Sequence, residues 1–381
     1  MFISDSDKKC LKQKNYKDLE IAVSEFLRLN EIDNTTLVND DECKELSSVI
    51  EVIFKDAYCD GEDESDLQDL IFIMLKTQIK EPDPEYTDSQ LNYLELQLAG
   101  LEKIPQPEQR TPEWFEFRKD RLTASTISNI VGVGHFGNIK DIIKDKCGCS
   151  KVYRSGVATE HGVKYEDVAC SIYATKTNSV VKEYGCIPHD THKFLGASPD
   201  GITPDGYMLE SKAPVKREIT GIPPPYYWVQ CQQQMQVCKL DIVHFLEVKI
   251  QEYTNIDDYI NDSGEDKNAP YTKEGFEKGV ILEYHKLDSD EGDIGYIYPE
   301  KLLNTDEIRT WFKEKSNEIN QDSAKQVRRL SYWKCTDYCL TEIYKDQEWW
   351  DSNVHKFKEF WEKVIYHRKN GFDDLLPKKR I

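Results

Sequence analysis

The Pro-Asp-Gly sequence at residues 204–206 predicts a tight turn, because proline fixes φ and glycine accepts the left-handed backbone that such turns need. The next six residues, 207–212, have the composition of a β-strand. We therefore expect a hairpin that brings Asp200, before the turn, into the neighbourhood of Glu210. Because side chains alternate between the two faces of a strand, Glu210 and Lys212 should point the same way, toward Asp200.

Helical and strand patterns alternate around this hairpin. Strand patterns cover residues 178–185, 194–198 and 243–250, and helical patterns cover residues 124–131, 160–174 and 226–237. This order predicts an α/β core with a central mixed sheet flanked by helices.

The charge of the chain is unevenly distributed. The 381 residues carry a formal net charge of −20. Residues 1–105 contain 25 acidic and 11 basic residues, whereas residues 106–250 contain 17 and 18. The first segment has apolar residues at helical spacing and ends at a proline-containing linker. We expect an acidic helical N-terminal module at residues 1–105 and a second domain at residues 106–381, with a motif core at 110–250 and a C-terminal extension at 251–381.

Composition also bears on where such a chain works. No apolar run approaches the roughly 20 residues of a membrane helix, and the amino terminus has no apolar segment of signal-peptide length. The 11 cysteines are odd in number and scattered along the chain. These features predict an intracellular protein with reduced thiols and no membrane partner.

The predicted hairpin places two carboxylates beside one lysine. Converging carboxylates repel each other, which raises one pKa unless a cation lies between them. Oxygen ligands without His or Cys select Mg²⁺ or Mn²⁺, and a neighbouring lysine can orient or deprotonate a water molecule. This is the chemistry of metal-dependent phosphodiester cleavage. The alternative is that Asp200 caps a turn and Glu210 pairs with Lys212 on a solvated strand.

The same residues resemble a known nuclease signature. Pro199-Asp200, followed by Glu210-Ser-Lys212, resembles the PD-(D/E)xK motif. Four blocks in matching order are similar to the YqaJ viral recombinase family, which includes lambda exonuclease: Trp114-Phe-Glu-Phe-Arg118 with Leu122-Thr-Ala-Ser125, Gly162-Val-Lys-Tyr-Glu166, Leu195-Gly-Ala-Ser-Pro-Asp200, and Tyr227-Trp-Val-Gln230. The resemblance covers about residues 110–250 and implies a restriction-endonuclease-like core.

The resemblance also implies roles for individual residues. Asp200, Glu210, Glu166 and the backbone carbonyl of Ser211 would bind metal, and Lys212 would position the attacking water. Gln230 would form a hydrogen bond near the lysine or the scissile phosphate. Arg118 and Ser125 match positions that hold a 5′-phosphate, which agrees with the bidentate grip of a guanidinium on phosphate.

Several of these residues have a second interpretation. Glu166 could be an exposed residue of an amphipathic helix, and Gln230 part of a polar face with Gln233 and Gln234. Trp114 could stack on a base or anchor the core. Asp190 is a further acidic candidate, although it reads equally well as part of a turn. The family pattern usually has a buried apolar residue where this chain has Ser211.

The resemblance implies a Mg²⁺-dependent deoxyribonuclease, with Mn²⁺ as a substitute, that degrades double-stranded DNA ends from 5′ to 3′. Such an enzyme would act in recombination, repair or genome processing of a large DNA virus, in the host cytoplasm, at a viral replication site or in the nucleus. Its partners would be DNA ends, a single-strand annealing protein and further copies of itself. The alternatives are a flap or structure-specific endonuclease and a DNA-end-binding scaffold with a vestigial site.

Overall fold

The computed structural model describes residues 19, 21–24, 26–27, 40–58, 64–76, 87–135, 137–149, 156–287, 293–372 and 375. Its helices are α2 (Asp40–Tyr58), α3 (Glu64–Lys76), α4 (Asp88–Lys103), α5 (Pro112–Lys119), α6 (Ala124–Ile130), α7 (Ile139–Lys146), α8 (Val157–Thr177), α9 (Pro225–Cys238), α10 (Ile256–Asn261), α11 (Thr305–Gln321) and α12 (Gln347–Asn370). Its strands are β1 (Leu122–Thr123), β2 (Ile187–Pro188), β3 (Leu195–Ala197), β4 (Gly201–Ile202), β5 (Met208–Lys212), β6 (Ile242–Glu252), β7 (Lys278–Lys286), β8 (Ile294–Ile297) and β9 (Lys325–Tyr344).

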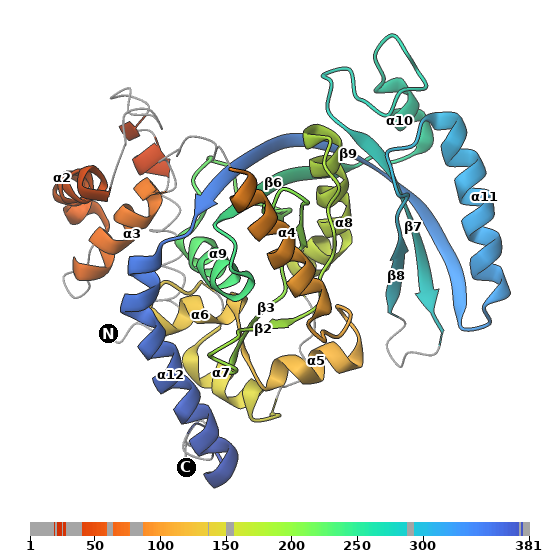
Figure 1. Cartoon of the computed structure of the whole chain (residues 1–381). Coiled ribbons are helices and arrows are strands. Elements are labelled where there is room, and N and C mark those ends of the chain that lie inside the picture. Colours follow the sequence, from red (N-terminus) through yellow and green to blue (C-terminus); the bar gives the residue numbers. More distant parts are fainter. Residues whose placement is uncertain are drawn as a thin grey trace, which may run out of the picture.

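These strands form two sheets. A three-stranded sheet has the order β1-β3-β2, and a six-stranded sheet has the order β4-β5-β6-β9-β7-β8. Within the larger sheet β5 and β6 run parallel, while the other neighbours are antiparallel. A mixed sheet flanked by helices confirms the predicted α/β core (Figure 1).

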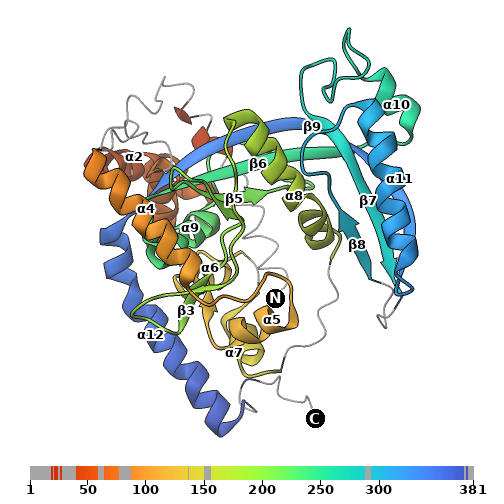
Figure 2. The ribbon, with the colours of Figure 1, turned by 45° about the vertical axis from the view of Figure 1, so that its right-hand side comes forward.

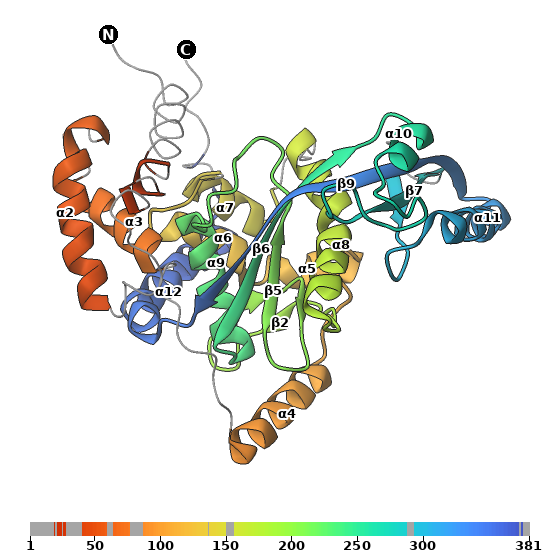
Figure 3. The same cartoon turned by 90° about the horizontal axis from the view of Figure 1, so that it is seen from above.

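Two helices cover opposite faces of the β5–β6 pair. Met208 and Phe245 pack with α9 in one apolar core, whereas Leu209 and Leu246 pack with α8 in another. Figure 3 shows α9 and α8 on opposite sides of these strands. This arrangement follows from the alternation of side chains along a strand, and it directs Glu210 and Lys212 toward α9.

The predicted hairpin forms between β4 and β5. Gly206 has a φ of +82°, and Thr203 and Tyr207 close the turn through a hydrogen bond of 2.9 Å from the N–H of Thr203 to the carbonyl of Tyr207. A left-handed φ of this kind favours glycine, so the turn residues account for the position of the hairpin.

The predicted strand at residues 178–185 is wrong. Of these residues only Lys182 joins a ladder, as an isolated bridge to Ile202. The N–H of Gly185 donates to the side chain of Gln106, and the carbonyl of Tyr184 accepts from the side chain of Gln109. At Tyr184 and Gly185, hydrogen bonds with glutamine side chains therefore replace those that a neighbouring strand would form.

The C-terminal extension completes the larger sheet. The 20-residue strand β9 pairs with β6 over residues 333–344 and with β7 over residues 325–334. Figure 2 shows it as one long, curved strand that leads to α12. Phe357 and Val364 of α12 are buried in the same apolar core as α9. The extension thus covers the edge that β6 would otherwise expose.

The N-terminal helices pack against the rest of the molecule. α2 and α3 share a small apolar core that also includes Ile222, and α4 contributes Leu101 to the main core. Lys76 forms an ion pair of 2.6 Å with Asp346 at the start of α12. The described helices of this segment are α2, α3 and α4, and a separate module at residues 1–105 stays a prediction. Among the described helices, none has both the length and the apolar content needed to cross a lipid bilayer.

Candidate active site

Asp200 and Ser211 join the two sides of the hairpin. The N–H of Asp200 donates to the carbonyl of Leu209 at 3.2 Å. Its Oδ2 accepts two hydrogen bonds from Ser211, from the N–H at 2.7 Å and from the hydroxyl at 2.8 Å. Ser211 is buried, and its two hydrogen bonds orient Asp200. This contact accounts for a serine at a position where the family pattern usually has an apolar residue.

Glu210 lies beneath this pair, with 1 % of its surface exposed. Its Oε1 accepts hydrogen bonds from Lys212 Nζ and, at 2.6 Å, from Gln230 Nε2. Its Oε2 accepts from Gln234 Nε2 at 2.6 Å. Burial raises the pKa of Glu210; Lys212 opposes this rise and Asp200 adds to it. Glu210 and Lys212 are therefore not a solvated surface pair.

Lys212 is the positively charged residue that contacts Glu210. Burial lowers its pKa, but the charges of Glu210 and Asp200 outweigh burial and raise the pKa above its ordinary value. The Nζ atom also lies 5.0 Å from the ring centroid of Tyr227. The ammonium group of Lys212 is therefore stabilised in its charged form, and it donates a hydrogen bond to Glu210.

Glu166 reaches the same neighbourhood from α8. Its Oε1 lies 2.8 Å from Nη2 of Arg110, and about a third of its side chain is exposed, at 32 %. Burial and the charge of Asp200 raise the pKa of Glu166 to about 8, while Arg110 and Lys212 oppose the rise. Glu166 is thus not a fully solvated helix residue, and the charges of both Asp200 and Lys212 act on its carboxylate.

The donor set of this site fits a hard divalent cation. Within the described ranges, no three His, Cys, Asp or Glu side chains form a preformed metal site. Glu210 and Glu166 instead face Lys212 and Arg110. Burial, together with the charge of Asp200, raises the pKa of both carboxylates, and a bound cation would oppose this rise. Asp200, Glu210, Glu166 and the Ser211 carbonyl are the oxygen ligands that Mg²⁺ or Mn²⁺ would find here.

A second group of predicted residues lies on α5 and α6. The guanidinium carbon of Arg118 is 3.9 Å from the ring centroid of Trp114, and Nη2 of Arg118 is 3.5 Å from Oγ1 of Thr123. Thr123 Oγ1 is in turn 3.5 Å from Oγ of Ser125. Trp114 is buried, and its Nε1 donates to Ser198 at 3.2 Å. Trp114 is thus buried and stacks on Arg118, and Thr123 lies between Arg118 and Ser125.

Asp190 is occupied elsewhere. It lies 2.6 Å from Lys239 and 3.0 Å from His189 in ion pairs near the molecular surface. The hydrogen bond from Lys239 lowers the pKa of Asp190 to about 2. Among the described residues, Asp190 pairs with Lys239 and His189 rather than with Asp200 or Glu210, so the structure does not bring it into the carboxylate cluster.

Two glutamines near the site, Gln234 and Gln109, were not predicted as site residues, although Gln234 was noted as part of a polar helix face. Gln234 lies one helical turn after Gln230, so their spacing was the available signal. Gln109 Nε2 donates to the carbonyl of Tyr184 at 2.8 Å and to that of Pro199 at 3.2 Å. No local pattern marks Gln109, because these partners are 75 and 90 residues away in the sequence.

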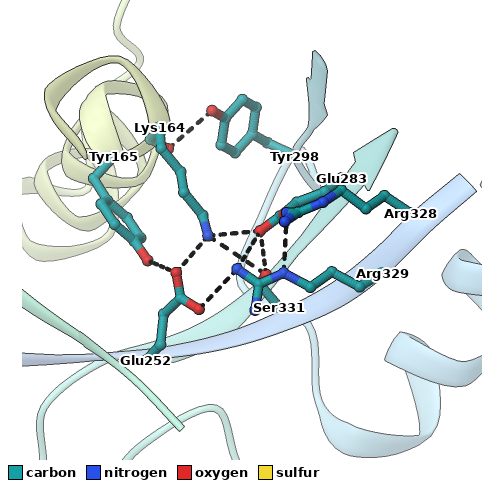
Figure 4. A network of polar contacts seen from close by, with 8 residues as sticks. All are labelled: Lys164, Tyr165, Glu252, Glu283, Tyr298, Arg328, Arg329 and Ser331. Atoms are coloured by element: carbon teal, nitrogen blue, oxygen red, sulfur yellow. Dashed lines mark hydrogen bonds and ion pairs between the residues drawn. The ribbon is translucent and has the colours of Figure 1, made fainter. Parts of the chain in front are cut away.

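A polar network anchors α8 to the extension (Figure 4). Lys164 Nζ donates to Glu283 of β7 at 2.7 Å and to Glu252 of β6. The hydroxyl of Tyr165 donates to Glu252 at 2.7 Å. Because Glu166 follows these residues directly, the network holds the turn of α8 that faces the carboxylate cluster.

The region of the chain that contains these residues matches a known protein family. Residues 113–241 match the family model of the YqaJ-like viral recombinase domain. The chain contains a YqaJ-like domain. The resemblance predicted from the four sequence blocks is thereby confirmed. The YqaJ-like domain begins in α5 and ends one residue before β6, so it includes every predicted site residue from Trp114 to Gln230.

The comparisons also found a viral relative and solved structures. The chain is 31% identical over 323 residues to "uncharacterized protein R354" of Acanthamoeba polyphaga mimivirus, a match that covers 76% of this chain and 58% of that protein. The chain thus spans less than two thirds of this relative. The alkaline exonuclease LHK-Exo of Laribacter hongkongensis is 18% identical, with a TM-score of 0.40 and coverage of 68% of this chain and 95% of that one. A phage-related exonuclease of Haemophilus somnus is 13% identical, with a TM-score of 0.35 and coverage of 67% and 96%.

Proposed function

We propose that this protein is a Mg²⁺-dependent deoxyribonuclease, and that it degrades double-stranded DNA from 5′ ends. The observation that carries the proposal is the grouping of Asp200, Glu210 and Lys212 on one hairpin, with Glu166 supplied by α8. The YqaJ-like domain that contains these residues supports it. Mn²⁺ would substitute for Mg²⁺, because both cations take the same oxygen ligands.

The side chains of the site divide the work of phosphodiester hydrolysis. Asp200, Glu210, Glu166 and the Ser211 carbonyl would hold the cation, which when bound stabilises negative charge on the phosphate and makes water more acidic. Lys212, as a protonated donor, orients the attacking water and stabilises charge that develops on a phosphate oxygen. Gln230 and Gln234 hold Glu210 in place through hydrogen bonds of 2.6 Å each.

The polarity of degradation would come from Arg118 and Ser125. A guanidinium binds phosphate through two parallel hydrogen bonds, and the stack on Trp114 preorganises it. A 5′-phosphorylated end bound there would determine which phosphodiester bond lies at the carboxylate cluster. The 3′ single strands left behind would suit a single-strand annealing protein in viral recombination, repair or genome processing.

The test compares linear and covalently closed circular duplex DNA in Mg²⁺, in Mn²⁺ and in EDTA. We expect loss of linear duplex only, from 5′ ends, and only with a divalent cation. Cutting of closed circles would favour a structure-specific endonuclease, and binding of ends without cutting would favour a scaffold.

The variant Lys212→Ala should abolish hydrolysis while its thermal unfolding stays cooperative. Lys216→Ala is the matched control, because it removes an exposed lysine from the loop that follows β5 and should keep full activity. Full activity of Lys212→Ala in Mg²⁺ would contradict the proposed mechanism.

A further inference from the structure

Arg110 forms ion pairs with two adjacent carboxylates of α8. Its Nη2 atom lies 2.8 Å from Oε1 of Glu166, and its Nη1 atom lies 3.9 Å from Oδ2 of Asp167. Arg110 precedes α5 and lies outside the matched YqaJ-like region, which begins at residue 113. No sequence motif pointed to it.

The backbone of Arg110 is unusual. Three residues other than glycine have a positive φ in the described part of the chain: Arg110 at 65°, Asn178 at 51° and Lys239 at 57°. Asn178 and Lys239 terminate α8 and α9, where a left-handed residue is common. Arg110 terminates no helix. Glycine would adopt this conformation without strain, so an arginine here indicates a role for its side chain.

The preceding residue fixes Arg110 beside the carboxylate cluster. Gln109 donates to the carbonyl of Pro199, the residue before Asp200, and to that of Tyr184. The segment that carries Arg110 is therefore bound to the loop of Asp200, while the guanidinium itself contacts α8. Arg110 thus joins the two elements that supply Asp200 and Glu166.

We propose that Arg110 is a built-in counter-ion of Glu166 that competes with the divalent cation for this carboxylate. The inference rests on the proposed function, because it takes Glu166 as a metal ligand. Arg110 holds Glu166 in place in the metal-free protein and lowers the affinity for the cation. Its own positive charge disfavours a second cation nearby.

The test is calorimetric titration of the full chain with Mn²⁺, without DNA. Arg110→Gly should bind Mn²⁺ about two- to five-fold more tightly than the unmodified protein, which is the scale of a partly exposed ion pair. Arg110→Lys keeps the charge and should stay near the unmodified affinity. Asn178→Gly is the matched control, because it places glycine at a different left-handed position, at the end of α8, and should leave affinity unchanged.

A double variant shows whether Arg110 acts through Glu166. In the Glu166→Gln background, Arg110→Gly should no longer increase Mn²⁺ affinity. An equal or weaker affinity of Arg110→Gly than of the unmodified protein would overturn the inference, as would an equal gain in the Glu166→Gln background. Absence of Mn²⁺ binding by the unmodified protein would instead overturn the proposed metal site, and the role of Arg110 with it.

Discussion

Lys164 of α8 and Glu283 of β7 form a buried ion pair of 2.7 Å across 119 residues of sequence. Arg328, Arg329 and Ser331 also contact Glu283. A buried carboxylate needs such partners, since burial without them is costly. The pair couples the helix that carries Glu166 to the C-terminal extension.

Replacing Lys164 by methionine should destabilise the protein. Loss of one partner of a buried ion pair costs about 3–5 kcal/mol, and the remaining partners of Glu283 place this case near the lower end, at about 3 kcal/mol. The free energy of unfolding from urea denaturation at neutral pH measures the change. Lys315→Met, which removes the partner of Glu318 from a partly exposed pair on α11, should change that free energy by less than about 1 kcal/mol.

Glu283 should make the free energy of unfolding depend on pH in the acidic range. Burial raises its pKa, but hydrogen bonds from Arg329, Lys164 and Ser331 outweigh burial and hold the pKa at about 2. Because the folded pKa lies below the ordinary value of 4.5, its stabilisation is complete above that value and disappears as the pH falls toward 2. The difference in unfolding free energy between the unmodified protein and Glu283→Gln should shrink across this window. A constant difference would contradict the prediction.

Gln234→Leu should shift the pH dependence of DNA hydrolysis. Gln234 donates to the charged form of Glu210, so its loss raises the pKa of Glu210 further. The acidic limb of the rate profile should move upward by about one pH unit, the scale of one hydrogen bond to a charged group. Gln236→Leu, on the same helix but bonded to Gln347, should leave the profile in place.

Arg118→Lys should weaken the preference for a 5′-phosphate. Lysine retains the charge but loses both the planar stack on Trp114 and the bidentate geometry. The ratio of degradation rates on 5′-phosphorylated and 5′-hydroxyl linear duplexes should fall about ten-fold, the effect of one charge-assisted hydrogen bond. Arg121→Lys changes a similar stack, on Phe117, and should preserve the ratio. An unchanged ratio in Arg118→Lys would remove this residue from end recognition.

Local chemistry allowed much of this site to be predicted. The turn at residues 204–206 and the alternation along β5 were enough to place Glu210 and Lys212 near Asp200. The glutamine-rich face of α9 could be recognised from the sequence. Which partner each glutamine contacts could not. Gln230 and Gln234 turn toward Glu210, whereas Gln233 donates to the carbonyls of Leu122 and Gly196 in the smaller sheet.

Long-range contacts could not be predicted in the same way. Arg110 and Glu166 are 56 residues apart, and neither belongs to a periodic pattern that would pair them. The absence of a strand at residues 178–185 has the same origin, because Gln106 and Gln109 satisfy its backbone from a distant segment. Asp190 is the opposite case. Its position shortly before Asp200 suggested a place in the carboxylate cluster, but it pairs with a nearby lysine, Lys239.

The length of β9 makes the extension inseparable from the rest of the fold. One uninterrupted strand forms hydrogen bonds to β6 with one half and to β7 with the other. A protein truncated after residue 252 would leave the whole of β6 as an open edge, and such edges recruit strands from other molecules. The extension and the YqaJ-like region should therefore unfold as a single cooperative unit, and shortened versions of this chain should aggregate rather than fold on their own.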